Sequence, residues 1–355
     1  MFLVCGAGGV GKTHTVRAVG SAVNGNLLAG AMTGSAGSEL FNGETLHSLL
    51  AFGVNRRPLG GSKYLQLRGN KLLEKQAQSR DVRVVVIDET SMLSAVALAH
   101  IKLTLDEIYD GRPFVLLLLG DNLQIDPVGH RAVYKDTVDR YILNPSTVLA
   151  DTNEDLVAIG CRLYESASTF FLTRQMRAAS DPHHQNMIDR IRRMMEKPVD
   201  DIFLEYLKMH EIKSEELSDI KLADAPVLVT TNFERRKVNE ERLLYFAQLT
   251  GSVVFRWKLN ARMSKKDCES IVENVILNTD DSGAEPIYQY FVKDLPSVLT
   301  ENICVKLGIS NGTFVRMNSL VFDVDELEDD EEEFIFPVTD RAAPGTIIDL
   351  PFNAP

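Results

Sequence analysis

The sequence predicts an α/β fold built on parallel sheets, and three observations lead to this prediction. Short apolar runs alternate with segments in which apolar residues recur at helical spacing, the pattern of strands joined by crossover helices. A glycine-rich turn, residues 6–13, stands between the first apolar run and the first helical segment. The chain has 355 residues, about two domains' worth, and 45% of them are hydrophobic, so it can bury a substantial core.

Each expected strand is a short apolar run, and the first helix follows the glycine-rich turn. This helix should begin at Lys12 or Thr13, because Val16, Val19 and Val23 then give it one apolar face. The expected strands are residues 2–5, 28–33, 82–87, 114–119, 169–172, 227–231 and 253–257.

Cysteine content and hydropathy exclude several classes of protein. Four cysteines, Cys5, Cys161, Cys268 and Cys304, lie far apart with no histidine at ligand spacing, which excludes a disulfide scaffold and argues against a zinc site. The longest apolar run, residues 114–119, is six residues long, whereas a helix needs roughly 20 to cross a bilayer. Since no basic leader precedes the first strand, we expect an intracellular protein with no membrane partner.

The formal net charge of −12 is concentrated in one segment. Nine acidic residues fall within residues 323–333, a run typical of a solvated loop, and the rest of the chain carries only −3. By contrast, residues 54–83 contain eight basic and two acidic residues, and Tyr64 among them could stack on a base. This segment fits a nucleic-acid partner, although a solvated helix would explain the same charges.

Residues 6–13 match the pattern G-x-x-x-x-G-K-[ST] of a phosphate-binding loop between a strand and a helix. The glycines allow consecutive N–H groups to face phosphate oxygens at the start of the helix. Lys12 would reach the β- and γ-phosphates, and the Thr13 hydroxyl would ligate Mg²⁺. The sequence therefore predicts a P-loop nucleotide site, and its expected binding residues are Gly6, Gly8, Gly9, Val10, Gly11, Lys12, Thr13 and His14.

Two adjacent carboxylates end the expected strand 82–87. Asp88 would hold the hydrated Mg²⁺, and Glu89 would polarise the attacking water. After the next strand, the Gln124 amide is placed to sense the γ-phosphate. The alternatives are a helix N-cap for the two acids and a polar turn closed by Pro127 for the glutamine.

These three segments, in this order, resemble the superfamily-one DNA helicases, in particular the petite-integration-frequency (PIF-one) family and its RecD-like relatives. Further similar segments follow in the family's order as far as about residue 313. Residues 33–48 are similar to the segment that lies under single-stranded DNA, and residues 172–177 to the one that carries an arginine finger. Residues 230–232 and 311–313 resemble motifs of the second motor domain.

The resemblance implies a domain organisation and a set of site residues. It implies two RecA-like domains, residues 1–178 and 226–355, joined by connecting helices in residues 179–225, with ATP at the domain interface. Arg177 would stabilise charge on the transferring phosphoryl group, unless it is a surface ion-pair partner. His47 would contact DNA, and the alternative is a structural role, because lone histidines are often structural. The implied DNA-binding residues are Thr33, Gly34, His47, Ser48, Thr231, Asn232, Asn311 and Thr313.

The chain departs from the family at both ends. The upstream glutamine that reads adenine is missing, so a preference for ATP over GTP rests on the resemblance. The last motif, with its second catalytic arginine, is also missing, although residues 334–338 and 344–350 look like the strands before it. We therefore expect an incomplete second domain and weak hydrolysis.

The expected function is that of an ATP-dependent 5′–3′ DNA helicase motor that uses Mg²⁺ and acts on single-stranded DNA and duplex junctions. By the same resemblance it would serve DNA repair or recombination, in the nucleus or mitochondrion of a eukaryote. Three other classes stay open, namely a P-loop kinase, a ring-forming ATPase and a degenerate nucleotide- and DNA-binding fragment without catalysis.

Overall fold

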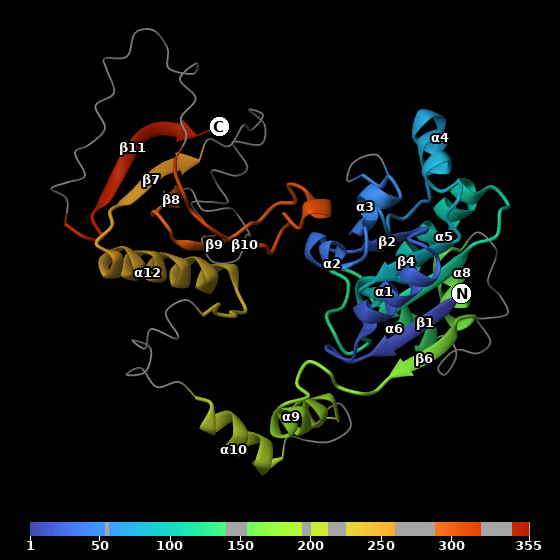
Figure 1. Ribbon diagram of the computed structural model, residues 1–355, viewed down its shortest axis with the longest axis horizontal. Coiled ribbons are helices and arrows are strands. Elements are labelled where there is room, and N and C mark those ends of the chain that lie inside the picture. The colour runs from blue at the N-terminus through green and yellow to red at the C-terminus, as the bar shows by residue number, and fades with distance from the viewer. Residues whose placement is uncertain are drawn as a thin grey trace, which may run out of the picture. The chain divides into compact units, whose positions relative to one another are not determined.

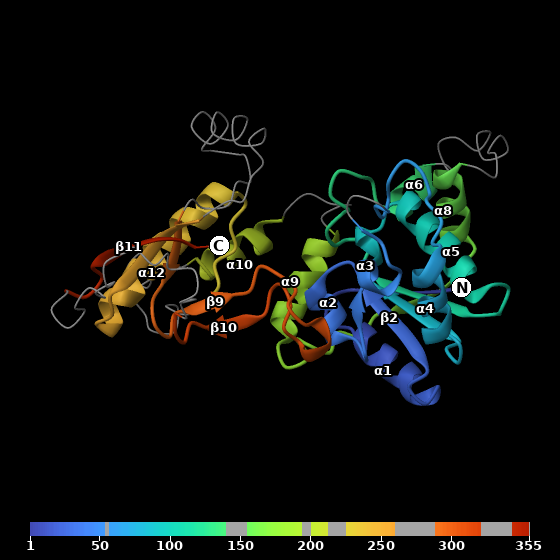
Figure 2. The ribbon, with the colours of Figure 1, turned by 90° about the horizontal axis from the view of Figure 1, so that it is seen from above.

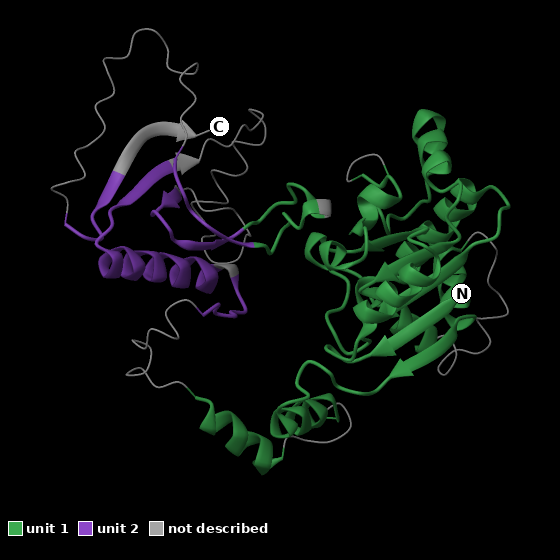
Figure 3. Cartoon of the chain, viewed as in Figure 1, with its two compact units in different colours: residues 1–211, 299–313 green, residues 212–298, 314–355 purple. Residues whose placement is uncertain are grey.

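A computed structural model describes residues 1–53, 57–139, 155–193, 200–211, 225–259, 288–320 and 343–354. The chain divides into two compact units, shown in Figures 1 and 3. Unit 1 comprises residues 1–211 and 299–313, and unit 2 comprises residues 212–298 and 314–355.

A six-stranded sheet forms the centre of unit 1, and its neighbouring strands all pair in parallel. Because the strands are parallel, the loops that follow β1, β4 and β5 leave from the same edge of the sheet. This architecture confirms the predicted α/β fold. In spatial order the strands are β3 (Glu44–Thr45), β2 (Leu27–Ala31), β4 (Val84–Asp88), β5 (Val115–Gly120), β1 (Phe2–Gly6) and β6 (Ser168–Leu172).

Helices cover both faces of this sheet, as Figure 2 shows, with α5, α6 and α8 together on one side and α1 on the other. Helix α1 begins at Lys12, as predicted, and Val16 on it is fully buried. The helices of unit 1 are α1 (Lys12–Ala22), α2 (Gly34–Glu39), α3 (Leu46–Leu49), α4 (Gly69–Gln78), α5 (Ala95–Tyr109), α6 (Val133–Val138), α8 (Leu156–Glu165), α9 (Pro182–Arg193) and α10 (Asp201–Met209), with 3₁₀ turns η1 (Thr90–Met92) and η4 (Val305–Leu307).

The central strands bury side chains on both faces, which explains why they read as unbroken apolar runs. Along β4, Val85 and Ile87 belong to the core cluster that contains α5, while Val84 and Val86 belong to the cluster that contains Val16 of α1. The alternation of side chains along a strand therefore divides one apolar run between two cores.

Unit 2 contains the long helix α12 (Asn232–Thr250) and two small sheets. In one sheet β7 (Val254–Leu259) pairs in parallel with β11 (Ile347–Ala354) and antiparallel with β8 (Tyr288–Phe291). In the other, β9 (Pro296–Val298) pairs antiparallel with β10 (Phe314–Arg316). The buried core of unit 2 includes Leu243, Ala247, Val254 and Val292.

One expected strand, residues 227–231, is wrong. Residues 225–229 form no strand, and Leu228 is 98% exposed. Thr231 instead caps α12, because its hydroxyl accepts the N–H of Glu234 and the Glu234 carboxylate accepts the N–H of Thr231. An apolar run needs a neighbouring strand to pair with, and none of the described residues supplies one.

Other expectations fall partly outside the described residues. The acidic run 323–333 and the expected strand 334–338 lie entirely outside them. Strand β11 begins at Ile347, within the expected strand 344–350. The domain boundaries at residues 178 and 226 stay a prediction.

Candidate nucleotide and DNA site

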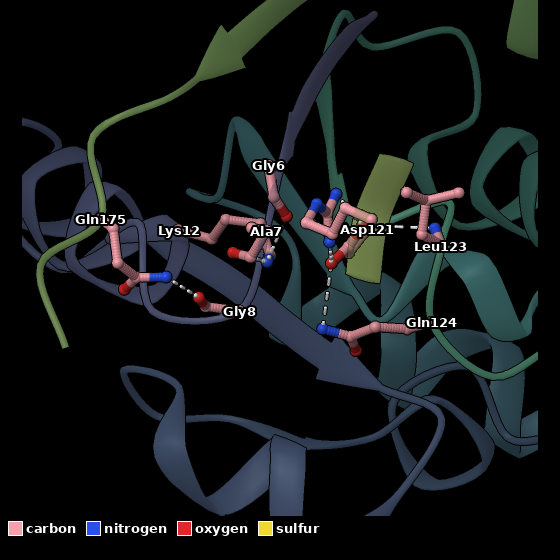
Figure 4. A network of polar contacts seen from close by, with 9 residues as sticks. Gly6, Ala7, Gly8, Lys12, Asp121, Leu123, Gln124 and Gln175 are labelled. Atoms are coloured by element: carbon pink, nitrogen blue, oxygen red, sulfur yellow. Dashed lines mark hydrogen bonds and ion pairs between the residues drawn. The ribbon is translucent and has the colours of Figure 1, made fainter. Parts of the chain in front are cut away.

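The turn between β1 and α1 closes around the Lys12 side chain. Its ammonium group donates hydrogen bonds to the carbonyl oxygens of Gly6, at 2.8 Å, and Ala7, at 3.1 Å, as Figure 4 shows. Gly9 and Gly11 have φ angles of 83° and 99°, which a residue with a Cβ adopts only with strain. The turn thus combines a cation with the N-terminus of α1, an arrangement suited to phosphate oxygens.

The other expected ligands are placed by this turn. Thr13 lies in the first turn of α1, Val10 is buried, and His14 is exposed. The Thr13 hydroxyl, which the sequence pattern identified as a Mg²⁺ ligand, therefore lies at the N-terminus of α1.

The segment after β6 packs directly on the glycine turn. The Gln175 amide donates to the Gly8 carbonyl at 2.8 Å, and the N–H groups of Met176 and Arg177 donate to the Gly9 carbonyl at 2.9 and 3.1 Å. A Cβ on Gly9 would lie 2.3 Å from Gln175 Oε1 and 2.7 Å from Arg177 Cβ, and the φ of 83° is one that residues with a side chain rarely adopt, so glycine suits this close approach. These backbone contacts hold Arg177, whose side chain is exposed, beside the loop.

Asp88 and Glu89 lie at the carboxyl end of β4. Asp88 is buried and accepts the Glu89 N–H at 2.8 Å. Burial raises the pKa of Asp88, and that hydrogen bond and the charge of Lys12 offset part of the effect. Burial and the Asp88 charge raise the pKa of Glu89, against the charge of Lys12. Both carboxylates are therefore within electrostatic reach of the Lys12 ammonium.

Glu89 also has an unusual backbone. Its φ of 57° and ψ of 45° lie in the left-handed region, which costs a residue with a side chain of the order of 1 kcal/mol. Such strain is concentrated at functional sites because the surrounding structure has to maintain it.

The loop after β5 contains a buried carboxylate that the sequence analysis did not select. Asp121 is 2% exposed, and the two guanidinium nitrogens of Arg192 on α9 donate to its two oxygens at 2.7 and 2.8 Å. Burial alone would raise the pKa of Asp121, but the hydrogen bonds from Arg192 and from the Leu123 N–H lower it below its usual value. The position of Asp121 directly after a buried strand could have indicated a functional acid, but its partner Arg192 is 71 residues away in the sequence.

Gln124 lies next to this carboxylate. Its amide Nε2 is 3.4 Å from Asp121 Oδ2, and a Cβ on Gly8 would lie 3.6 Å from the same nitrogen. The Gln124 amide is therefore close both to Asp121 and to the glycine turn, and Figure 4 shows its nitrogen directed at the Asp121 carboxylate.

Four of the expected DNA-binding residues lie close together in unit 1. The Thr33 hydroxyl accepts the Ala36 N–H at 3.2 Å and begins α2 at Gly34. Gly34 touches Asn302, whose Oδ1 accepts the Asn311 N–H at 3.0 Å. In the same segment, Thr313 donates its hydroxyl to the Gly308 carbonyl at 2.9 Å. The contacts bring residues 33–34 and 311–313 to one place.

The remaining expected DNA-binding residues have structural partners or lie elsewhere. The Ser48 hydroxyl donates to the Glu44 carboxylate, and burial lowers the pKa of the half-buried His47. Thr231 forms the capping box at the start of α12, where Asn232 is the first residue, and both belong to unit 2.

Part of the basic segment 54–83 is structural. Arg57 donates to the Leu50 carbonyl at 2.9 Å and the Leu65 carbonyl at 2.6 Å, and its guanidinium lies 4.5 Å from the centre of the Phe52 ring. The Tyr64 hydroxyl is 3.1 Å from Thr104 Oγ1, so this ring packs within the fold. The described basic residues that are exposed are Lys63, Arg68, Lys71, Arg80 and Arg83.

The comparisons identify the family. The chain belongs to the PIF1-like helicase family, which matches residues 1–197. A search of curated proteins finds no match. Within the described residues no helix is long and apolar enough to cross a membrane.

Solved structures of Pif1 helicases share the fold. They include two coordinating Pif1 helicases at forked duplex DNA (TM-score 0.59, 19% identity), the Pif1 helicase of Candida albicans (0.57, 17%) and that of Bacteroides with ADP-AlF3 and single-stranded DNA (0.58, 17%). Each match covers 90% of this chain and 67%, 65% and 66% of those chains, respectively. The chain thus spans about two thirds of their length.

Proposed function

We propose that this chain is an ATP-dependent DNA helicase motor that moves 5′ to 3′ on single-stranded DNA and opens duplex junctions. The observation that carries the proposal is the meeting of the glycine turn, the pair Asp88–Glu89 and Gln124 at one edge of a parallel sheet. Membership of the PIF1-like helicase family supports it. The direction of movement, a role in repair or recombination and a place in the nucleus or mitochondrion rest on the resemblance.

The turn and Lys12 would bind the phosphates of the nucleotide. In the present structure the Lys12 ammonium is held by two carbonyl oxygens of the same turn, and phosphate oxygens would replace these acceptors. Since the turn also presents the N-terminus of α1, both a full and a partial positive charge would face the phosphates.

Thr13 and Asp88 would hold Mg²⁺. A hydroxyl at the helix N-terminus and a buried carboxylate are hard oxygen donors, and within the described residues no cluster of three or more His, Cys, Asp or Glu offers a complete protein cage. Few protein ligands suit an ion that keeps its waters and binds substrate phosphates. When bound, Mg²⁺ would neutralise negative charge on the phosphates.

Glu89 would accept the proton of the attacking water. Burial and the neighbouring Asp88 raise its pKa, which brings the carboxylate closer to the range of an effective general base. Gln124 would contact the γ-phosphate, and Arg177 would stabilise charge on the transferring phosphoryl group.

DNA would bind at the surface formed by residues 33–34 and 311–313, with His47 and Ser48 in the same unit. For unit 2, the resemblance implies that Thr231 and Asn232 also bind DNA. The hydrogen-bonding groups of these segments suit the sugar–phosphate backbone, which carries no sequence information.

The test measures ATP hydrolysis with and without oligodeoxythymidine. We expect DNA to stimulate hydrolysis, Lys12→Ala to lose nucleotide binding, and Glu89→Gln to keep binding of nucleotide and DNA while turnover falls at least a hundredfold. Lys102→Ala, which removes a surface ion pair with Asp106, is the control. Unwinding of duplexes with a 5′ or a 3′ tail tests the direction.

Each failure has its own meaning. Hydrolysis that is indifferent to DNA would point to a kinase-like P-loop enzyme. Nucleotide and DNA binding unchanged by Glu89→Gln, with no turnover in either protein, would show a binding module without catalysis. Either result overturns the motor proposal.

A further inference from the structure

The Asp121–Arg192 ion pair is unusually asymmetric in its exposure. The Asp121 side chain is 2% exposed, whereas that of Arg192 is 29% exposed. Both carboxylate oxygens accept from the same guanidinium, the paired geometry that arginine forms best. If the arginine were removed, the carboxylate would keep its burial and lose its main partner, while the arginine without the acid could turn to water.

A second cation acts on Asp121. Burial raises the pKa of Asp121 and the hydrogen bonds from Arg192 lower it below its usual value, and the charge of Lys12 adds to this lowering. Burial and the charge of Asp88 are the main causes that raise the pKa of Glu89, and the charge of Asp121 adds to them. Asp121 therefore belongs to the same electrostatic neighbourhood as the glycine turn and the carboxylates of β4. Among the described residues, Arg192 and Lys12 are the two cations that lower the pKa of Asp121. Without Arg192, the buried Asp121 carboxylate would therefore interact mainly with Lys12, the side chain expected to bind phosphates.

Asp121 also organises the loop that carries Gln124. It accepts the Leu123 N–H at 3.2 Å and lies 3.4 Å from the Gln124 amide. Because Arg192 holds both oxygens of the Asp121 carboxylate, it also holds the start of the loop that hydrogen-bonds to them. Neither neighbour on α9 repeats the arrangement, because Arg190 pairs with Asp200 and Arg193 is exposed.

We propose that Arg192 is a positioning residue of the nucleotide site, which neutralises Asp121 so that Lys12 stays available for phosphate and Gln124 stays beside the glycine turn. The inference rests on the proposed nucleotide site. It adds a residue from the helix α9, outside the family's nucleotide-binding segments quoted above, to the residues on which that site depends.

The test is a charge-rescue experiment. Arg192→Met leaves Asp121 buried and unpaired, and we expect it to weaken binding of a fluorescent ADP analogue about tenfold or more and to lower kcat/KM for ATP likewise. Adding Asp121→Asn removes the uncompensated charge, and the double variant should recover most of the affinity. Asp121→Asn alone should be milder than Arg192→Met, because Arg192 can reach solvent. Arg193→Met is the matched control on the same helix.

The outcomes separate the possible roles. If the double variant is as impaired as Arg192→Met, or if Arg192→Met binds nucleotide normally, the proposal is overturned. Thermal melting of every variant identifies a loss of folding, and Arg192→Lys, which keeps the charge without the paired geometry, should fall between the wild type and Arg192→Met. Because ADP binding needs no turnover, failure of the helicase proposal would leave a wild type that binds nucleotide without hydrolysing it.

Discussion

An added methyl group at Gly160 on α8 should lower the stability of unit 1, because it would meet the backbone of a neighbouring helix. A Cβ there would lie 1.9 Å from the Ala95 carbonyl oxygen, 2.6 Å from its carbonyl carbon and 2.9 Å from its Cα. All three are backbone atoms at the start of α5, so no side chain can turn aside. Since ordinary contacts are about 3.5 Å, Gly160→Ala requires the two helices to separate by roughly 1.5 Å.

The expected magnitude follows from two opposed effects. Alanine gains about 1 kcal/mol over glycine inside a helix, whereas overpacking costs up to about 3 kcal/mol where the backbone resists. Gly160→Ala should therefore destabilise unit 1 by about 2 kcal/mol, which lowers the Tm by roughly 4–8 °C for a domain of this size. The separation should also disturb the β5 loop, because Tyr164 of α8 hydrogen-bonds Asn122 at 3.3 Å.

Gly20 on α1 provides a matched control. It is also a buried helical glycine, but its closest neighbours would be the side chains of Leu27, at 3.1 Å, and Phe41, at 3.4 Å. These can shift, so Gly20→Ala should keep most of the gain from helix propensity. Melting followed by circular dichroism measures both variants. A Gly160→Ala protein that melts at or above the wild-type temperature would refute the reasoning.

Two further predictions concern titration and DNA binding. Burial lowers the pKa of His100, against a hydrogen bond to the Pro58 backbone that raises it, and Nδ1 of the ring accepts the Gly60 N–H at 3.2 Å. The unfolded chain therefore takes up a proton more readily, and stability should fall as the pH drops below about 6.5. His100→Asn should weaken this pH dependence in melting curves at pH 7.5 and 5.5, while His130→Asn, at an exposed site, should not. Gly34→Ala would place a Cβ 1.9 Å from Asn302 Oδ1 and displace its bond to Asn311, so affinity for oligodeoxythymidine should fall about threefold to tenfold. The loss should disappear in an Asn302→Ala background, measured by fluorescence anisotropy, and an additive loss in the double variant would contradict the contact.

Local patterns predicted much of unit 1. The strand β4 and the start of α1 at Lys12 were visible in the sequence because apolar periodicity and the phosphate-loop spacing are properties of short segments. The same reasoning failed at residues 227–231, where an apolar run carries no information about whether a partner strand exists. The basic segment 54–83 shows the same limit, since a charge count did not reveal that Arg57 is held by carbonyl oxygens and a ring.

The sequence by itself determined the residue types of the nucleotide site and their order, because a glycine turn before a helix and two acids after an apolar strand depend on neighbours along the chain. Tertiary structure alone decided that Arg192, rather than Arg190 or Arg193, faces Asp121. All three arginines fall within four residues of α9, and only the packing of that helix against the β5 loop distinguishes them. Ion pairs between residues far apart in the sequence depend on which surfaces pack together, and the periodicity of a short segment does not predict that packing.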